Sequence, residues 1–387
     1  MRIGIPREIL QREGRVAALP ETVGEYVEMG FDVLVESSAG LRVFRSDDEY
    51  ADAGARIVDE PEELFSEADI ILKVKQPVFN DRVGKYEVEM MREEAILVTF
   101  LHPASPSNHA MIRMLQDRKI TSFTMDGIPR ELSHAQKMDA LTSMSTVTGY
   151  KSVLIAANNF PKFIPMIGTA IGTIMPAKIL VIGAGVVGLQ AIATAKRLGG
   201  AITAVDIRED ARKAAESLGV QVPGFDVPAN LALGTGGYAK ALPTAWLEKE
   251  CAFLAPLLEE ADIVIAGALV PGEVAPTLID EKTVERMKPG SVIVDVAIDQ
   301  GGNCALTVGG EDTTRHGVWI CGTLNIPGSV PVHASWLYEK NMLEFVKNLF
   351  RNGVGIPEWN DEIVKHSLVT HAGMVFYDGA LKAMKAA

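Results

Sequence analysis

Three glycines in the middle of the chain have the spacing of a dinucleotide-binding turn. Gly183, Gly185 and Gly188 directly follow an apolar run and directly precede a segment with helical periodicity. The first glycine of such a turn allows a tight reversal, the second lets a pyrophosphate approach the backbone, and the third lets the helix pack closely on its strand. Amides at the helix N-terminus, including those of Val186 and Val187, can then hold phosphate oxygens. We therefore predict a dinucleotide site at this turn.

A carboxylate at the end of the next predicted strand supports this prediction. Asp206 lies 18 residues after Gly188 and is followed by Ile207. A carboxylate at this distance can accept hydrogen bonds from the adenosine ribose hydroxyls and repels a 2′-phosphate. The motif therefore favours NAD(H) over NADP(H), although Arg208 nearby weakens that preference. The plainer alternative is a glycine-rich turn that binds nothing.

A second loop is expected to touch the same cofactor. Ala268 and Leu269 follow the strand predicted over residues 262–267. Loops at the carboxyl ends of parallel strands commonly contact ligands, because these ends meet at one edge of the sheet. A simple turn without a ligand is the alternative interpretation.

The composition of the 387-residue chain excludes several classes of protein. Lys and Arg number 37 against 50 Asp and Glu, a net charge of −13 without a basic block, so we expect no nucleic acid or anionic membrane as partner. The cysteines are widely spaced and form no metal-binding pattern, which predicts neither disulfides nor a metal. The N-terminal segment lacks the apolar region of a signal peptide, and no run is long enough to span a membrane. A cytoplasmic location is the simplest expectation.

The elements that must position these residues alternate between short apolar runs and helix-like segments, which is the pattern of βαβ units. Many runs are apolar on both faces, as in buried parallel strands. The strands predicted in the N-terminal third of the chain are Arg2–Ile5, Asp32–Val35, Ile70–Val74, Ile96–Phe100 and Ile120–Thr124, with helices such as Pro20–Met29 and Asn108–Asp117 between them.

A long helix, Asp139–Asn159, is predicted to lead into a second α/β unit. Its predicted strands are Lys178–Ile182, Ala201–Val205, Asp262–Gly267, Ser291–Val296 and Gly317–Cys321, and its first helix is Val187–Leu198. Residues 221–240 lack periodicity and indicate a functional loop. The helix predicted over residues 335–350 returns to the first unit. We therefore expect one domain of residues 1–138 with 330–387, which would bind substrate, and a nucleotide-binding domain of residues 139–329.

With these motifs in view, the chain resembles the family of alanine dehydrogenases and pyridine nucleotide transhydrogenase alpha subunits along nearly its whole length. The matching segments are IGIPREILQREGRVAALP, KVKQP, AQKMDALTSMSTVTGY, ILVIGAGVVGLQAIATAKRLGG, GGYAK, ALVPGEVAPTLI, GSVIVDVAIDQGGNC and NIPGSVP. The resemblance implies an α/β fold of two Rossmann-like, doubly wound parallel-sheet domains with NAD(H) in the cleft between them. It also implies a homo-oligomer, either a dimer or a hexamer.

The transhydrogenase branch of the family is matched by several features. Gln136 and Asp139 match its nicotinamide contacts, and Tyr238 lies in the motif GGYA of its mobile loop. The segments AIATAKRLGG and WNDEIVKHSLVTHAGMV also resemble this branch. The chain departs from the branch at three positions: Arg130 is one residue further upstream than usual, His134 replaces an Arg, and Lys137 replaces a Ser.

The alanine dehydrogenase branch is matched by four substrate-pocket residues. These are Arg15 in GRVA, Lys75 in KVKQP, His102 in FLHP and Asp299 in AIDQGG. Ser145, in Met144-Ser145, also resembles this branch and is expected near the cofactor. The transhydrogenase branch generally keeps the Arg and lacks the other three.

These four residue types suit amino acid chemistry. Arg15 can hold a carboxylate through two parallel hydrogen bonds, and Lys75 can polarise a 2-oxo group. His102, whose imidazole titrates near neutral pH, can transfer protons, and Asp299 can orient water or the amine. Each residue also has a plainer interpretation: a solvated loop arginine, a lysine at a strand end, a structural histidine and an aspartate that caps a turn.

Two functions follow from this mixture of features. The first is an NAD-dependent amino acid dehydrogenase, which reversibly oxidises a small L-amino acid to a 2-oxo acid and ammonia by hydride transfer. The second is the separate NAD(H)-binding piece of the alpha subunit of a proton-translocating NAD(P) transhydrogenase, with membrane and NADP(H)-binding subunits as partners. We take the first as the primary hypothesis and the second as its alternative.

Overall fold

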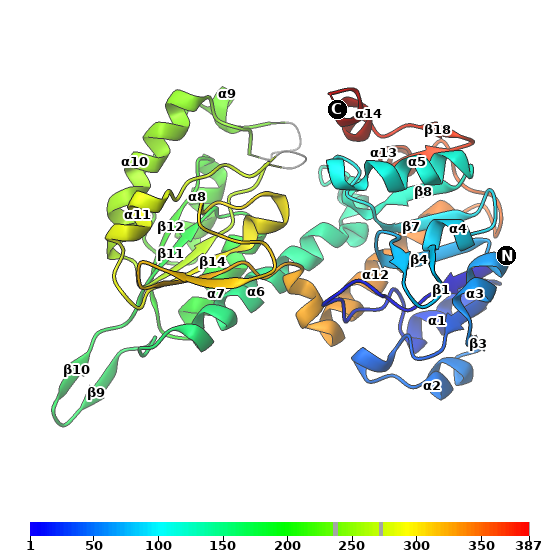
Figure 1. Cartoon of the computed structure of the whole chain (residues 1–387), viewed down its shortest axis with the longest axis horizontal. Helices are drawn as coiled ribbons and strands as arrows, with labels where there is room; N and C mark the ends of the chain where they lie inside the picture. Colours follow the sequence, from blue (N-terminus) through cyan, green and yellow to red (C-terminus); the bar gives the residue numbers. More distant parts are fainter. Residues whose placement is uncertain (235–238, 271–273, 387) are drawn as a thin grey trace. The chain divides into compact units, whose positions relative to one another are not determined.

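The computed structural model describes residues 1–234, 239–270 and 274–386 of the chain. The chain divides into two compact units, Met1–Met144 with Gly328–Ala387 and Ser145–Pro327 (Figure 1). The boundaries therefore fall at residues 144/145 and 327/328, where the sequence suggested 138/139 and 329/330. Among the described residues, no helix is long and apolar enough to cross a membrane.

Unit 1 is built on an eight-stranded sheet. Its strands in sheet order are β18 (Met374–Val375), β17 (Leu368–His371), β8 (Thr121–Thr124), β7 (Ile96–Phe100), β4 (Ile70–Lys75), β1 (Arg2–Ile5), β2 (Asp32–Glu36) and β3 (Arg56–Val58). The pairs from β8 to β3 are parallel, whereas β17 and β18 add an antiparallel edge. Every residue of β7 is buried, as expected for a central strand covered on both faces.

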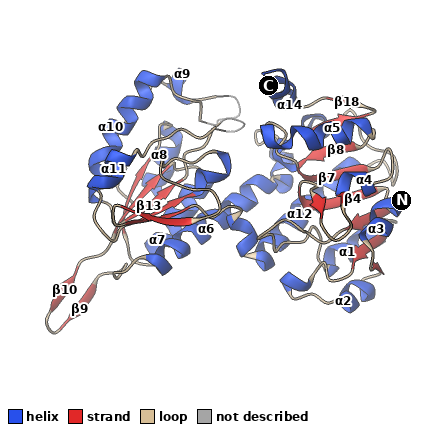
Figure 2. Ribbon diagram, in the orientation of Figure 1, coloured by secondary structure: helices blue, strands red, loops and turns tan. Residues whose placement is uncertain are grey.

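The helices of unit 1 cover this sheet (Figure 2). They are α1 (Pro20–Glu28), α2 (Asp47–Asp52), α3 (Pro61–Glu67), α4 (Glu87–Met90), α5 (His109–Asp117), α12 (Pro331–Leu349), α13 (Glu362–Ser367) and α14 (Asp378–Ala386). Proline occupies the first turn of α1, α3 and α12, where its missing N–H costs no intrahelical bond. The predicted return of the chain to the first unit is made by α12, in which Tyr338 and Phe345 are fully buried.

Unit 2 contains a six-stranded sheet with the order β12 (Ala201–Val205), β11 (Lys178–Ile182), β13 (Ile263–Ala266), β14 (Val292–Asp295), β16 (Val318–Cys321) and β15 (Asp312–Arg315). All pairs are parallel except β15 with β16. The chain passes from β11 to β12 on one side and later places β13 on the other side of β11. In open α/β sheets, ligands bind beyond the carboxyl ends of the strands at such a switch point.

The remaining elements of unit 2 frame its sheet. They are α6 (Ala140–Asn159), which begins in unit 1, α7 (Val186–Arg197), α8 (Glu209–Ser217), α9 (Ala229–Ala232), α10 (Thr244–Glu260) and α11 (Glu281–Arg286). A hairpin of β9 (Ile167–Thr169) and β10 (Gly172–Ile174) extends away from the sheet (Figure 1). The fold is thus α/β with two mainly parallel sheets, and antiparallel strands at the edge of each sheet modify the prediction of purely parallel sheets.

Candidate functional site

The glycine turn lies at the switch point of unit 2, between β11 and α7. Gly183 has a left-handed φ of 88°, and a Cβ there would lie 2.7 Å from the carbonyl oxygen of Gly267. A Cβ at Gly188 would lie 1.9 Å from the carbonyl oxygen of Gly183. At Gly185, by contrast, the nearest atom is 3.6 Å away and belongs to the Arg208 side chain. The two outer glycines therefore serve close packing, and the middle one leaves the backbone approachable, as a pyrophosphate requires.

Asp206, at the end of β12, lies beside the glycine turn and is hydrogen-bonded to it. Its carboxylate accepts a hydrogen bond of 2.8 Å from the Ala184 amide, which ties the acid directly to the glycine turn. The backbone amide of Arg208 donates to the same carboxylate at 2.8 Å, and the guanidinium donates through Nε at 3.1 Å and Nη2 at 3.0 Å. Asp206 is 7% exposed. The acid predicted to contact ribose is therefore already paired with a cation.

The loop after β13 is held against a later segment of the same unit by one buried side-chain amide. Asn303 accepts a hydrogen bond from the Ala268 amide and donates to the Ala268 carbonyl, both at 2.9 Å. The Asp295 carboxylate in turn accepts from the backbone amide of Asn303 at 3.0 Å. This network fixes Ala268 and half-buried Leu269 at the same sheet edge as Gly183. Asn303 and Asp295 were not predicted from sequence, although the Gly-Gly-Asn after Asp299 is a signal for such a turn.

The residues expected to contact nicotinamide lie at the start of α6. Asp139 is buried and caps this helix, because its carboxylate accepts from the amide and the hydroxyl of Thr142 at 2.8 and 2.5 Å. The guanidinium of Arg130 lies 3.1 Å from the same carboxylate. Gln136 is exposed in the preceding turn, and Ser145 is half-buried on α6. Asp139 thus has a structural task at this helix end, and a contact with nicotinamide stays a prediction. Tyr238 lies outside the described residues.

In unit 1, the ends of β4 and β7 bring two of the predicted substrate residues near each other. Lys75 ends β4 in register with Phe100 of β7, and His102 follows two residues later. The His102 ring stacks on Phe100 at 5.7 Å between centroids, and Phe100 also contacts Tyr338 at 5.4 Å. The side chain of His102 is 40% exposed, so the imidazole can be reached from solvent.

The imidazole of His102 has an acidic partner that sequence analysis missed. Its Nδ1 lies 2.8 Å from Asp126, and the backbone amide of His102 also donates to this carboxylate at 2.8 Å. Burial alone would raise the pKa of Asp126, but the charge of His102 and hydrogen bonds from His102 and Thr124 lower it to about 2. A carboxylate held ionised in this way orients the ring and fixes which nitrogen carries the proton. The clue in the sequence is that Asp126 lies two residues after Thr124, where β8, the strand beside β7, ends.

Arg15 lies in the irregular segment between β1 and α1 and is buried, with 3% exposure. Glu13 accepts from its Nε at 2.8 Å and from its Nη2 at 2.5 Å, so the guanidinium is gripped by a carboxylate of its own chain. The Nη1 group lies 2.9 Å from the sulfur of Met144. The structure therefore places Arg15 in a neutralised ion pair and not on the surface, contrary to the plainer interpretation of a solvated loop arginine.

Asp299 belongs to a short 3-10 helix of unit 2, Val296–Gln300, and is exposed. Its carboxylate lies 3.4 Å from the Asn325 amide. A carboxylate in this setting can act as an acceptor for solvent or a ligand. Its role in amino acid chemistry stays a prediction.

A buried charge cluster surrounds Lys73 of β4, two residues before Lys75. The ammonium of Lys73 is 1% exposed and lies 2.8 Å from Glu87 and 3.5 Å from Glu8. Glu8 also accepts from the Val74 amide at 2.6 Å. Burial raises the pKa of Glu8 to about 7, although Lys73 opposes that shift. This cluster fixes the end of β4, which carries Lys75. The alternation of charged and apolar residues in Ile-Leu-Lys-Val-Lys gave no sign that Lys73 is buried.

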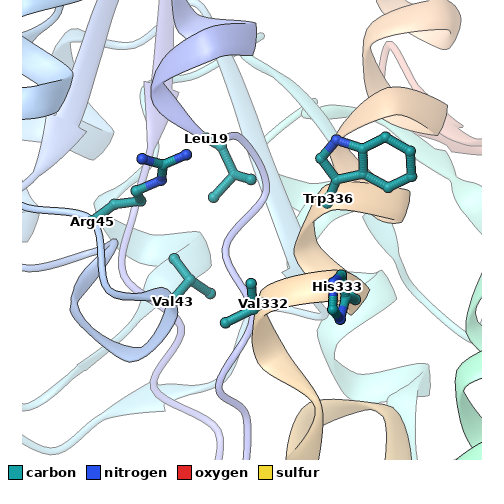
Figure 3. A pocket seen from close by; sticks show the side chains of 6 residues that line it. All are labelled: Leu19, Val43, Arg45, Val332, His333 and Trp336. Carbon is teal, nitrogen blue, oxygen red and sulfur yellow. The ribbon is translucent and has the colours of Figure 1, made fainter.

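A cavity of about 440 Å³ opens elsewhere in unit 1 (Figure 3). It lies beside the first turns of α12, and its lining residues are Leu19, Val43, Arg45, Val332, His333 and Trp336. No predicted site residue lines it. The predicted chemistry therefore does not depend on the walls of this cavity.

Comparison with known proteins identifies the family. The N-terminal domain described as alanine dehydrogenase/PNT matches residues 4–148, and the C-terminal domain of the same description matches residues 152–378. The chain belongs to the alanine dehydrogenase/PNT family. It is therefore related to NAD(P)-dependent oxidoreductases.

Relatives from both branches of this family cover most of the chain. The first of the separate pieces of NAD(P) transhydrogenase subunit alpha from Rhodospirillum rubrum is 40% identical over 380 residues, which are 97% of this chain and 98% of the relative. Alanine dehydrogenase from Staphylococcus epidermidis is 34% identical over 339 residues, which are 86% of this chain and 82% of the relative.

Solved structures of the alanine dehydrogenase/PNT family resemble the fold equally well. A transhydrogenase structure from Sinorhizobium meliloti has a TM-score of 0.83 at 37% identity and covers 97% of this chain and 100% of its own. An L-alanine dehydrogenase structure has a TM-score of 0.82 at 27% identity and covers 100% and 99%. The backbone therefore does not separate the two branches, whereas sequence identity is higher with the transhydrogenases.

Proposed function

We propose that this chain is the NAD(H)-binding piece of the alpha subunit of an NAD(P) transhydrogenase. The observation that carries the proposal is the 40% identity to such a component along 98% of that protein's length. This reverses the order of the two hypotheses drawn from sequence alone, since the alanine dehydrogenase relative is less similar and matches a smaller share of both chains.

The nucleotide turn of unit 2 supports the cofactor aspect of this proposal. Gly185 leaves room beside the backbone, Gly183 and Gly188 allow close packing, and Asp206 lies next to the turn. Bound NADH would supply a hydride from its nicotinamide ring. The amides at the start of α7 would hold the pyrophosphate, and Ala268 and Leu269 would contact the cofactor from the neighbouring loop.

Under this proposal the chain needs protein partners to complete hydride transfer. These would be an NADP(H)-binding subunit and membrane-embedded subunits, and the chain itself would act as a homo-oligomer on the cytoplasmic side. The net charge of −13 suits docking on basic protein surfaces better than direct binding to anionic lipid.

The proposal is tested by hydride exchange between NADH and an NADP analogue. Exchange is expected only when the purified NADP(H)-binding subunit is added to the full chain. An Asp206→Ala variant serves as a control, because it should weaken NADH binding and slow the exchange at limiting NADH. Absence of exchange with the added partner, in protein that binds NADH, would contradict the proposal.

A second candidate function is an amino acid dehydrogenase, which the paired His102 and Asp126 favour. Their 2.8 Å contact provides an oriented imidazole with partial solvent access, and Lys75 ends the neighbouring strand. The reaction would be the oxidation of a small L-amino acid by NAD⁺ with uptake of one water, which gives a 2-oxo acid, ammonium, NADH and a proton. Turnover of NADH with pyruvate and ammonium by the chain alone would support it. Background turnover across a panel of 2-oxo acids would leave the transhydrogenase component as the function.

A further inference from the structure

The carboxylate of Asp206 is saturated with hydrogen-bond donors from its own unit. One oxygen accepts from the Ala184 amide at 2.8 Å and from Nη2 of Arg208 at 3.0 Å. The other accepts from the Arg208 amide at 2.8 Å and from its Nε at 3.1 Å. An ionised carboxylate offers about four acceptor positions. All of them are occupied, and two are occupied by the guanidinium.

This saturation has a consequence for ribose recognition. Hydroxyls of an adenosine ribose can donate to Asp206 only where the Arg208 guanidinium has withdrawn. The Arg208 side chain is 15% exposed and lies 3.6 Å from the Cβ position of Gly185, so it sits at the border of the phosphate turn. A withdrawn guanidinium would therefore remain beside the bound nucleotide.

Two further charged residues bear on Asp206: the acid Glu250, and Arg212, which binds backbone carbonyl oxygens and not the Asp206 carboxylate. Glu250 of α10 is buried, with 6% exposure, and burial together with the charge of Asp206 raises its pKa to about 7. Arg212 donates to the carbonyl oxygens of Asp206, Ile207 and Phe225 at 3.1–3.2 Å. Arg212 therefore holds the backbone, while Arg208 neutralises the Asp206 carboxylate.

We infer that Arg208 controls the nucleotide selectivity of unit 2. It lowers the ratio of the NADPH to the NADH dissociation constant and so reduces the preference for NAD(H) over NADP(H). This inference rests on the proposed function, in which the glycine turn binds NAD(H). An unpaired acid at this position repels a 2′-phosphate, whereas an arginine accommodates one. This chain carries both, joined in one ion pair.

The direction follows from comparing the two nucleotides. When NADH binds, the guanidinium gives up its ion pair with Asp206 and gains no phosphate at the 2′ position. When NADPH binds, the guanidinium can exchange the carboxylate for 2′-phosphate oxygens, which are strong charge-assisted acceptors. Without Arg208, NADPH would meet the charge of Asp206 and, above pH 7, that of Glu250. The ratio of the NADPH to the NADH dissociation constant should therefore rise when Arg208 is removed.

The experiment measures the dissociation constants of NADH and NADPH by calorimetry at pH 8 with the full chain. Arg208→Met removes the charge at similar side-chain length, and Arg208→Lys keeps it. Lys213→Met is the matched control, because Lys213 lies on α8 with 69% exposure and pairs with Glu209 at 2.6 Å. It removes the same charge from the helix that directly follows Arg208, without touching Asp206.

We expect Arg208→Met to raise the ratio of the two constants by about tenfold. Arg208→Lys should stay within about threefold of the unchanged chain, and Lys213→Met within about twofold. An unchanged ratio in Arg208→Met, or an equal rise in Lys213→Met, would overturn the inference alone. Failure of the unchanged chain to bind either nucleotide would overturn the proposed function together with the inference.

Discussion

His102 is the residue at which the two candidate functions give opposite expectations. Its backbone has a left-handed φ of 46°, its ring lies on Phe100, and Asp126 holds its Nδ1. A histidine fixed by three features in this way is either a proton-transfer group or a structural element of the strand end. The nucleotide turn lies in the other unit and should not depend on it.

Replacing His102 with Ala is expected to leave the NADH dissociation constant within about twofold of the unchanged chain, because the cofactor turn and Asp206 are intact. In a transhydrogenase component, partner-dependent exchange should also persist. In an amino acid dehydrogenase, turnover with pyruvate and ammonium should fall by about 100-fold or more. NADH titration and both rate assays on one preparation distinguish these results. A large loss of NADH affinity would contradict the separation of roles.

Gly188 provides a second prediction at this scale. A Cβ there would lie 1.9 Å from the Gly183 carbonyl oxygen, so α7 would have to move away from β11. Gly188→Ala should lower the free energy of unfolding by about 2–4 kcal/mol and weaken NADH binding strongly. Gly24→Ala is the matched control in α1, where a Cβ meets nothing within 4 Å. That change should be neutral or slightly stabilising. Similar melting temperatures for the two variants would contradict the packing argument.

At the scale of elements, helix α10 carries a buried acid whose ionisation opposes folding. The pKa of Glu250 is raised from 4.5 to about 7, first by burial and then by the charge of Asp206. The folded chain therefore holds this proton more tightly than the unfolded chain. The contribution of protonated Glu250 to the free energy of unfolding is full below pH 4.5 and is lost as the pH rises through 7.

Glu250→Gln should therefore stabilise the chain by on the order of 2 kcal/mol at pH 8 and by little at pH 5. Denaturant unfolding at both pH values measures the difference. Glu248→Gln is the control, because Glu248 is exposed on the same helix. A gain that is equal at both pH values would show that ionisation of Glu250 is not its source.

Strand β4 depends on a buried ammonium in a similar way. Lys73 is 1% exposed between Glu87 and Glu8, so its loss would leave two buried acids without their cation. Lys73→Met should cost about 3–5 kcal/mol of stability at pH 8, because the two buried acids must then either stay ionised without a cation or take up protons. Lys85→Met, which removes an exposed ion pair with Glu62, should change the free energy of unfolding far less, because solvent screens that pair. Comparable losses in the two variants would refute the role of burial.

The predictability of the elements follows their burial. The central strands, such as Ile96–Phe100 and Lys178–Ile182, were predicted with the bounds that the structure has, because strands whose residues are nearly all buried form almost continuous apolar runs. Strand β15, Asp312–Arg315, was missed because its Asp-Thr-Thr-Arg sequence is polar and lies at an edge. Helix α10 was missed because Pro256 lies inside it.

The candidate site was predictable only where its residues are local in sequence. The glycine turn and Asp206 are close in sequence and follow a known spacing, and the structure brings them together. The pairing of His102 with Asp126 depends on the order of strands in the sheet, which no local pattern encodes. The pairing of Arg15 with Glu13 is local, but nothing in the segment indicated that both side chains are buried.

At the scale of the whole molecule, each unit has apolar cores of its own. One cluster of buried residues in unit 1 includes Leu97 and Ile112, and two clusters in unit 2 include Val181 and Val264. Units with separate cores can unfold as separate cooperative transitions. The variants above give a means of assigning each transition, because Lys73 lies in unit 1 and Gly188 in unit 2.

Calorimetry of the full chain is therefore expected to resolve two transitions. Lys73→Met should lower the transition of unit 1, and Gly188→Ala should lower that of unit 2. NADH at 100 times its dissociation constant should add about 2.7 kcal/mol to the unit that binds it. Because the glycine turn and Asp206 both lie in unit 2, that shift should appear in the transition lowered by Gly188→Ala. A single transition that both variants lower equally would mean that the units unfold together, and an NADH shift confined to the Lys73-sensitive transition would move the cofactor site to unit 1.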